Sequence, residues 1–285
     1  MIKALNLDKE FRPTSHEPYL HKLLTFNGGE SHIKILNPKV YETVNTAIIT
    51  HRIQNGDNIM QILIAADAIR RNGTKDIELI IPYLPYARQD RLCDIGESFT
   101  LKIFCDLINS ANFSKVTILD AHSDVGPALL NNCVNISNKE YVQRAAHDIQ
   151  KMCDMDIILV SPDSGANKKV NQLFYGLPGL FTDVIKCDKK RDMTTGELSG
   201  FKVFCDDLNG QTCLIVDDIC DGGRTFIGIA EALKAKGAGD IFLFVTHGIF
   251  SNGFEELNKH FMHIYTTQSF KTFPRDSVTQ ISIEL

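Results

Sequence analysis

The first half of the chain alternates short apolar runs with longer amphipathic segments. Residues 31–36, Ser-His-Ile-Lys-Ile-Leu, alternate polar and apolar side chains and predict a half-buried strand. Further strands are predicted at Thr46–Ile53, Ile77–Ile81 and Val116–Leu119, and amphipathic helices at Asn58–Arg71 and Thr100–Ala111. Strands that alternate with helices favour an α/β fold with a largely parallel sheet.

The same rhythm begins again after a polar segment near residues 131–139. Strands are predicted at Ile157–Val160, Phe181–Lys186, Cys213–Val216 and Ile241–Val245, and helices at Tyr141–Cys153, Ala166–Tyr175 and Thr225–Lys236. Residues 188–199 are polar and glycine-containing, which predicts a mobile loop. The repetition predicts two similar domains, residues 1–138 and 139–285, with the last residues able to pack back on the first domain.

Composition excludes several classes of protein. A hydrophobic content of 44% and a charged content of 23% are typical of a globular protein that can bury a core. The formal net charge of −5 argues against general nucleic-acid binding, which needs a basic face. The apolar runs are far shorter than a membrane span, and residues 1–10 lack a signal-peptide pattern. The eight cysteines contain no Cys-x-x-Cys pair, so reduced thiols in a cytoplasmic protein are expected.

One stretch, residues 213–225, joins an apolar strand to a helix through an acidic, glycine-rich turn. The residues after the apolar run include Asp217, Asp218, Asp221, Gly222, Gly223 and Thr225. Backbone N–H groups at a helix start bind phosphate, and glycine lets the backbone approach closely. The acids suit sugar hydroxyls or a bridging metal ion. The alternative is an ordinary strand-to-helix turn with an Asp cap, which needs only one of these acids.

This stretch resembles the phosphoribosyl-pyrophosphate motif of the type I phosphoribosyltransferase fold: two hydrophobics, two acids, a spacer and an acid–Gly–Thr loop. The resemblance implies that ribose 5-phosphate is bound by Asp217, Asp218, Asp221, Gly222, Gly223, Arg224 and Thr225. The family usually has Thr in place of Gly222 and often Gly in place of Arg224. A phosphate-binding hydroxyl is therefore absent, and Arg224 either supplies charge or points to solvent.

A second motif follows the strand at residues 77–81. It reads Pro-Tyr-Leu-Pro-Tyr-Ala-Arg-Gln-Asp-Arg over residues 82–91. Its arginines, Arg88 and Arg91, suit phosphate or adenine contacts, although alone the segment would be read as a surface loop with salt bridges. Beside the first motif, this stretch resembles the signature of the ribose-phosphate pyrophosphokinases. That resemblance implies two tandem phosphoribosyltransferase-like domains, each a mainly parallel sheet flanked by helices, with ATP on the first domain and ribose 5-phosphate on the second.

The resemblance runs nearly end to end. Residues 26–30, Phe-Asn-Gly-Gly-Glu, are similar to the family's adenine-binding loop, which reaches a neighbouring subunit's active site; here Gly28 replaces an Asp. Asp120–Ser123 and Ser161–Gly165 resemble a metal- and ATP-contacting segment and a pyrophosphate loop. The implied ATP-binding residues are Phe26, Gly28, Gly29, Glu30, Arg88, Gln89 and His122, and the implied metal residues are His122 and Asp163. Alone, His122 would be read as a structural histidine and Asp163 as a turn residue.

Residues 188–191, Asp-Lys-Lys-Arg, resemble the family's catalytic loop, which implies catalytic roles for Lys189 and Arg191. Without the other motifs, they would be read as a solvated basic run. The implied reaction transfers the pyrophosphoryl group of ATP to the 1-hydroxyl of ribose 5-phosphate, giving phosphoribosyl pyrophosphate and AMP, with Mg²⁺. Two alternatives stay open: a non-catalytic regulatory relative and, with less support, a phosphoribosyltransferase. The resemblance also implies self-association, at least as a dimer and commonly as a hexamer.

Overall fold

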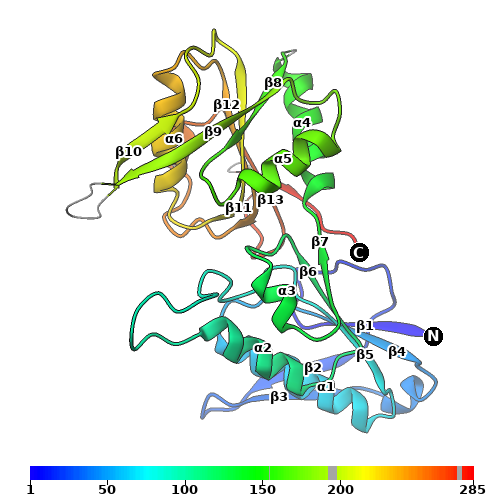
Figure 1. The fold of residues 1–285 in the computed structure, drawn as a ribbon. Helices are drawn as coiled ribbons and strands as arrows, with labels where there is room; N and C mark the ends of the chain where they lie inside the picture. Colours follow the sequence, from blue (N-terminus) through cyan, green and yellow to red (C-terminus); the bar gives the residue numbers. More distant parts are fainter. Residues whose placement is uncertain (154, 192–197, 275–277) are drawn as a thin grey trace. The chain divides into compact units, whose positions relative to one another are not determined.

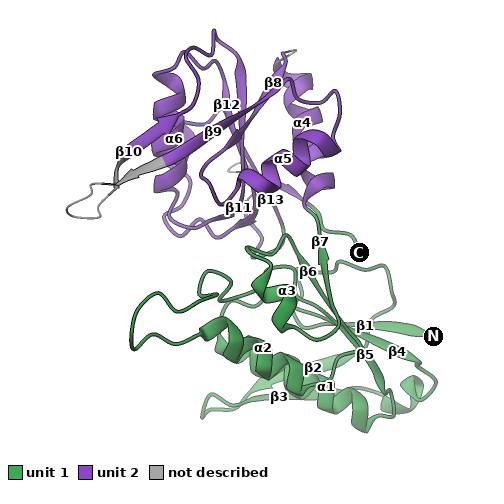
Figure 2. Cartoon of the chain, in the orientation of Figure 1, with its two compact units in different colours: residues 1–137, 268–270, 282–285 green, residues 138–267, 271–281 purple. Residues whose placement is uncertain are grey.

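The chain folds as two α/β units. The structure, a computed structural model, describes residues 1–153, 155–191, 198–274 and 278–285, with the backbone alone at 189–191 and 198–199. Unit 1 comprises residues 1–137, 268–270 and 282–285, and unit 2 comprises the described residues of 138–267 and 271–281 (Figure 2). The predicted α/β class is thereby confirmed. None of the described helices is both long and apolar enough to cross a membrane.

Unit 1 contains a parallel five-stranded sheet in the order β1-β4-β5-β6-β7 (Figure 1). Its strands are β1 (Ile2–Asn6), β4 (Thr46–Thr50), β5 (Asp76–Ile80), β6 (Lys115–Leu119) and β7 (Cys133–Ile136). A separate antiparallel hairpin joins β2 (His21–Thr25) to β3 (Ser31–Ile35). The helices are η1 (Pro38–Tyr41), α1 (Gly56–Arg71), α2 (Thr100–Ser110) and α3 (Val125–Leu129). Strands β1 and β7 were not predicted.

Helix α1 shows how the apolar pattern builds the core of unit 1. Ile62, Ala66 and Ile69 recur at helical spacing and are fully buried. The helix begins two residues before the predicted start, because the side chain of Asn55 accepts a hydrogen bond from the Asn58 N–H at 3.1 Å. Its arginine-rich last turn suits the negative end of the helix dipole.

The C-terminal segments of unit 1 are held by polar contacts from earlier parts of the chain. Buried Arg52 bonds Asp8 at 2.6 Å and donates to the Gln268 carbonyl at 3.5 Å. The Gln54 amide donates to the Phe270 carbonyl at 3.0 Å. These bonds explain why residues 268–270 belong to unit 1, although the residues on both sides of them belong to unit 2.

Unit 2 contains a seven-stranded sheet in the order β10-β9-β8-β11-β12-β13-β14 (Figure 1). Its strands are β8 (Ile157–Ser161), β9 (Asp183–Arg191), β10 (Leu198–Val203), β11 (Thr212–Cys220), β12 (Ile241–Gly248), β13 (His263–Thr267) and β14 (Thr279–Ile281). The helices are α4 (Lys139–Cys153), α5 (Asn167–Gly176), α6 (Arg224–Lys234) and η2 (Leu257–Lys259). Among the described strands of this sheet, only β10 is antiparallel to its neighbour.

Two predictions for unit 2 were wrong in their boundaries. Residues 188–191 were expected in a loop but continue β9, because their backbone pairs with β10. The mobile loop expected there falls largely on residues 192–197, which lie outside the described residues. Strand β11 was expected to end at Val216 but continues to Cys220, because the neighbouring strand β12 pairs with it as far as Gly248. Backbone pairing to adjacent strands therefore outweighs the low strand propensity of these charged residues.

Candidate active site

The phosphate loop, residues 221–225, connects β11 to α6. Gly223 immediately precedes α6 in a left-handed conformation, with φ 80° and ψ −12°, which glycine adopts without steric cost. A Cβ atom at this position would also lie 3.0 Å from the Leu257 Cδ2 atom. At the start of α6 the first backbone N–H groups have no acceptor within the helix. Because such groups together with the helix dipole attract anions, this helix start can bind a phosphate.

The carbonyl groups of the loop are bonded to a segment that the sequence interpretation did not single out. This segment, residues 249–252, follows β12. The backbone N–H groups of Ile249 and Phe250 donate to the Cys220 carbonyl at 2.9 and 3.1 Å. The Ser251 N–H donates to the Asp221 carbonyl at 3.1 Å. No sequence motif indicated this contact, because it depends on β12 lying beside β11.

Two adjacent carboxylates lie at the end of β11, directly before the phosphate loop. Asp218 is buried and Asp217 is partly buried. Burial raises the pKa of Asp217 well above its ordinary value, and the charges of Asp218 and Asp163 raise this pKa further. The Lys169 ammonium, on α5, lies 4.0 Å from an Asp218 oxygen. The site therefore gathers negative charge with one nearby lysine, an arrangement that can bind hydroxyl groups or a cation.

Asp163 reaches this group from the loop after β8. Its carboxylate accepts a hydrogen bond from the Ala166 N–H at 3.2 Å, and its carbonyl accepts one from the Ser161 hydroxyl at 3.1 Å. Across the described residues, no three or more His, Cys, Asp or Glu side chains are arranged as a metal centre. Mg²⁺ does not need one, because it binds through one or two carboxylates while keeping waters and substrate phosphates as ligands. The crowded carboxylates of Asp163 and Asp217 therefore fit Mg²⁺.

The predicted catalytic residues, Lys189 and Arg191, lie near the end of β9, and their side chains are outside the described part of the structure. In the backbone register, Lys189 is opposite Phe201 of β10. The Phe201 ring in turn packs against Gly228 of α6. Since α6 begins at the phosphate loop, this packing fixes the backbone of the β9–β10 hairpin next to that helix.

The predicted adenine-binding residues form the tip of the β2–β3 hairpin in unit 1. The Phe26 side chain is 55% exposed, and its ring lies 5.8 Å from the His32 ring between centroids. The turn is closed by a hydrogen bond from the Phe26 N–H to the Glu30 carbonyl at 2.9 Å. Gly29 has a φ of 90°, which favours glycine, whereas a Cβ atom on Gly28 would lie 3.9 Å from a Glu30 carboxylate oxygen, an ordinary contact. The hairpin therefore presents an exposed aromatic ring.

The other predicted ATP residues lie on two loops at the carboxyl ends of β5 and β6. Arg88, Gln89 and His122 are all exposed. Tyr86 and Asp120 have positive φ angles of 61° and 43°, an uncommon conformation that is frequent at functional sites.

Asp90, which the sequence interpretation passed over, joins these two loops. It is buried, and the Arg91 guanidinium donates to it at 3.1 Å. Burial acts to raise the pKa of Asp90, but hydrogen bonding from Ser123 and the charges of Arg91 and His122 outweigh it, so the pKa is lowered. Asp90 is therefore a buried carboxylate that connects the Arg88 loop to the His122 loop.

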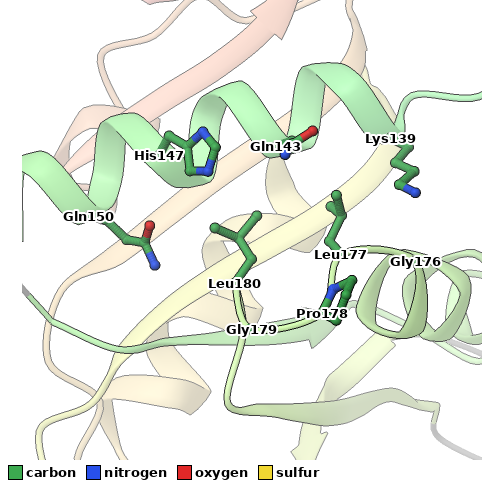
Figure 3. A pocket seen from close by; sticks show the side chains of 9 residues that line it. All are labelled: Lys139, Gln143, His147, Gln150, Gly176, Leu177, Pro178, Gly179 and Leu180. Carbon is green, nitrogen blue, oxygen red and sulfur yellow. The ribbon is translucent and has the colours of Figure 1, made fainter.

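A cavity of about 350 Å³ lies elsewhere in unit 2, between α4 and the loop after α5 (Figure 3). Lys139, Gln143, His147 and Gln150 form its helical wall, and residues 176–180 form the opposite wall. None of the predicted site residues lines it. The cavity is therefore separate from the candidate chemistry, which depends on open loops at strand ends.

Comparisons with known proteins identify relatives of this chain. A family model described as the N-terminal domain of ribose phosphate pyrophosphokinase matches residues 15–111, and a phosphoribosyl synthetase-associated domain matches residues 192–276. The ribose-phosphate pyrophosphokinase of Thermosipho africanus is 30% identical over 244 residues, covering 82% of this chain and 74% of the relative. That of Granulibacter bethesdensis is 32% identical over 198 residues, covering 69% of this chain and 62% of the relative.

The chain thus spans about three fifths of the length of several curated relatives that it matches, with shares of 60% and 62%. A crystal structure of phosphoribosylpyrophosphate synthetase from Mycobacterium smegmatis aligns with a TM-score of 0.80 and 24% identity. The alignment covers 99% of this chain and 94% of the other. This likeness confirms the predicted fold of two phosphoribosyltransferase-like domains.

Proposed function

The chain belongs to the ribose-phosphate pyrophosphokinase family, and from this membership we propose that it transfers the pyrophosphoryl group of ATP to the 1-hydroxyl of ribose 5-phosphate. The products are phosphoribosyl pyrophosphate and AMP. The observation that carries the proposal is the end of β11, where the acid pair Asp217–Asp218 leads directly into a helix start suited to phosphate. One end of a sugar phosphate needs hydroxyl acceptors and the other needs N–H donors, and this segment offers both.

Within the proposed site, the 5-phosphate accepts hydrogen bonds from the N–H groups of the phosphate loop. Gly222, Gly223 and Thr225 line this anion position, and Arg224, exposed at the first position of α6, adds positive charge. Asp217, Asp218 and Asp221 accept hydrogen bonds from the ribose hydroxyls. These contacts orient the 1-hydroxyl oxygen, which attacks the β-phosphorus of ATP as the bond to the AMP oxygen breaks.

On unit 1, ATP is held by side chains and backbone from two regions. Phe26 stacks on adenine while Glu30, Gly28 and Gly29 form the polar edge of that hairpin. Arg88, Gln89 and His122 hold the phosphates. In the family to which the chain belongs, this hairpin loop reaches the neighbouring subunit's site. We therefore propose self-association, at least as a dimer and, as is common in the family, as a hexamer.

Cations neutralise the negative charge that builds up during pyrophosphoryl transfer. Lys189 and Arg191 are the proposed catalytic cations of the chain, because guanidinium and ammonium groups stabilise the oxygen atoms of a transferring phosphoryl group. Asp163 and His122, each in its own unit, are the proposed metal-associated residues of the chain. Mg²⁺ would supply Lewis-acid neutralisation of the substrate phosphates when bound. Of Asp163 and His122, Asp163 suits Mg²⁺ better, because this hard cation prefers oxygen ligands. We further propose a cytoplasmic location.

The decisive experiment is an assay with ribose 5-phosphate, ATP and Mg²⁺ that follows AMP and phosphoribosyl pyrophosphate together. Equal formation of both products is the expected result. Formation of ADP in place of AMP would mean that the β-phosphorus is not attacked and would overturn the proposal. Binding of both substrates without any product would instead favour the regulatory relative.

A further inference from the structure

Gly222 is a glycine for a reason different from that of Gly223. Gly223 is left-handed, but Gly222 is not, so its backbone conformation accepts an ordinary side chain. The space for that side chain is taken. A Cβ atom on Gly222 would lie 3.0 Å from the Asn252 Nδ2 atom and 4.0 Å from the Ser251 hydroxyl oxygen.

The side chain that fills this space also bonds the loop. The Asn252 amide donates a hydrogen bond to the Gly222 carbonyl at 3.1 Å. With it, three successive carbonyls, those of Cys220, Asp221 and Gly222, accept hydrogen bonds from residues 249–252. A fourth, that of Gly223, accepts one from the Ile227 N–H at 3.1 Å. Each carbonyl of residues 220–223 is thus committed to a neighbour.

This arrangement has an electrostatic consequence. A peptide carbonyl turned toward a phosphate would repel it, whereas a peptide N–H attracts it. Hydrogen bonds to other groups hold the carbonyls of residues 220–223 in place. These carbonyl oxygens, which carry partial negative charge, are therefore kept from turning toward the anion position. In segment 249–252, Asn252 provides such a hydrogen bond with its side chain, and it acts on Gly222.

We infer that Asn252 is a positioning residue of the phosphate loop: its side chain fills the space beside Gly222 and holds the Gly222 carbonyl away from the 5-phosphate. The inference rests on the proposed function, because it assumes that this loop binds ribose 5-phosphate. It assigns to a residue outside the phosphate-binding motif the task of tuning affinity for the sugar phosphate.

The test measures the dissociation constant of ribose 5-phosphate, together with KM and kcat, for four proteins. These are the wild type, Asn252→Ala, Asn252→Asp and the control Asn258→Ala, which removes another exposed asparagine of the same region. Loss of one neutral hydrogen bond predicts that Asn252→Ala weakens ribose 5-phosphate binding about three- to tenfold. Asn252→Asp keeps the shape but brings a carboxylate, so it should bind more weakly still. For both variants KM for ATP and kcat at saturating substrate should stay near wild type.

A rescue experiment separates positioning from general damage to the loop. Gly222→Thr alone should bind ribose 5-phosphate weakly, because its side chain collides with Asn252. Combined with Asn252→Gly it should recover binding to within about three- to tenfold of wild type, since the residual loss is at most one hydrogen bond. Asn252 variants that bind like wild type, or a double variant no better than Gly222→Thr, would overturn the inference.

The outcomes also separate this inference from the proposed function. Binding that depends on Asn252 in a protein that forms no phosphoribosyl pyrophosphate would leave the inference standing and remove the function. Product formation with no effect of Asn252 would do the reverse. A wild type that binds no ribose 5-phosphate would overturn both.

Discussion

The ring of Phe201 lies directly against the backbone of Gly228, so closely that a Cβ atom on Gly228 would be 2.1 Å from the ring's Cε2 atom. Phe201 belongs to β10 and is opposite Lys189 of β9, whereas Gly228 lies in the second turn of α6. This contact connects the β9–β10 hairpin, which carries the proposed catalytic cations on β9, with the helix that begins at the phosphate loop. Both elements belong to unit 2, and the contact depends on the absence of a side chain at Gly228.

We therefore expect Gly228→Ala to displace the β9–β10 hairpin. In a helix interior this change would normally stabilise by about 0.5–1 kcal/mol, but overpacking here should cost about 1–3 kcal/mol. Urea unfolding should show the net loss, and kcat should fall with it. Adding Phe201→Leu should restore part of both, because the smaller side chain makes room. A Gly228→Ala variant more stable than wild type would show that the hairpin does not need this contact.

Lys189→Ala should lower kcat by orders of magnitude while leaving the dissociation constant of ribose 5-phosphate nearly unchanged. The reason is that a cation that neutralises developing charge acts mainly in the transition state. Lys190→Ala, the neighbouring lysine, is the matched control. Near-normal turnover of Lys189→Ala would remove it from the catalytic role.

Asp217→Asn should raise the free energy of unfolding and at the same time weaken the binding of ribose 5-phosphate. Burial and then the charge of Asp218 raise the pKa of Asp217 above 3.8. For a raised pKa, the associated stability is complete below the ordinary pKa and is lost as pH rises through the folded-state value. The variant should therefore be more stable than wild type at pH 7.

Urea unfolding of both proteins between pH 4 and pH 8 measures this difference, which should vanish toward the acidic end. Ribose 5-phosphate binding should weaken at least about tenfold, because one hydrogen-bond acceptor to the sugar is lost and charged acceptors make the stronger bonds. Parallel pH profiles for the two proteins would contradict the assignment.

Asp90→Asn should act in the opposite direction. The pKa of Asp90 is lowered, so its stabilising effect is present above the ordinary pKa of 3.8 and is lost as pH falls through the folded-state value. At pH 7 the variant should lose about 1.5–3 kcal/mol, the range for a hydrogen bond to a charged group. KM for ATP should rise because the Arg88 and His122 loops are no longer joined. Asp106→Asn, which breaks an exposed helical ion pair, is the control and should change stability by less than about 0.5 kcal/mol.

Phe26→Ala should weaken ATP binding with little change in the free energy of unfolding. The side chain is 55% exposed, so the free energy of unfolding should change by less than about 0.5 kcal/mol. Loss of one base–aromatic stack should raise KM for ATP about tenfold. Phe26→Tyr retains the ring and should behave like wild type. An unchanged KM in Phe26→Ala would remove the β2–β3 hairpin from adenine binding.

The sequence by itself determined the α/β class, the repeated strand–helix units and the phosphate loop, because each of these is encoded by short-range patterns. Apolar periodicity gives α1, and the acid pair followed by Gly222 and Gly223 marks the start of α6. These signals lie within one local segment, so they can be read without knowing its neighbours.

The features that depend on pairing between distant segments were decided only by the tertiary structure. The extension of β11 through Asp217 and Asp218 needs the backbone of β12, and the hairpin at Lys189 needs β10. The roles of Asp90 and Asn252 likewise arise from contacts with other loops, Asp90 with Ser123 and Asn252 with Gly222. Such contacts carry no local pattern, because a side chain's partner across the fold is fixed by sheet order rather than by sequence spacing.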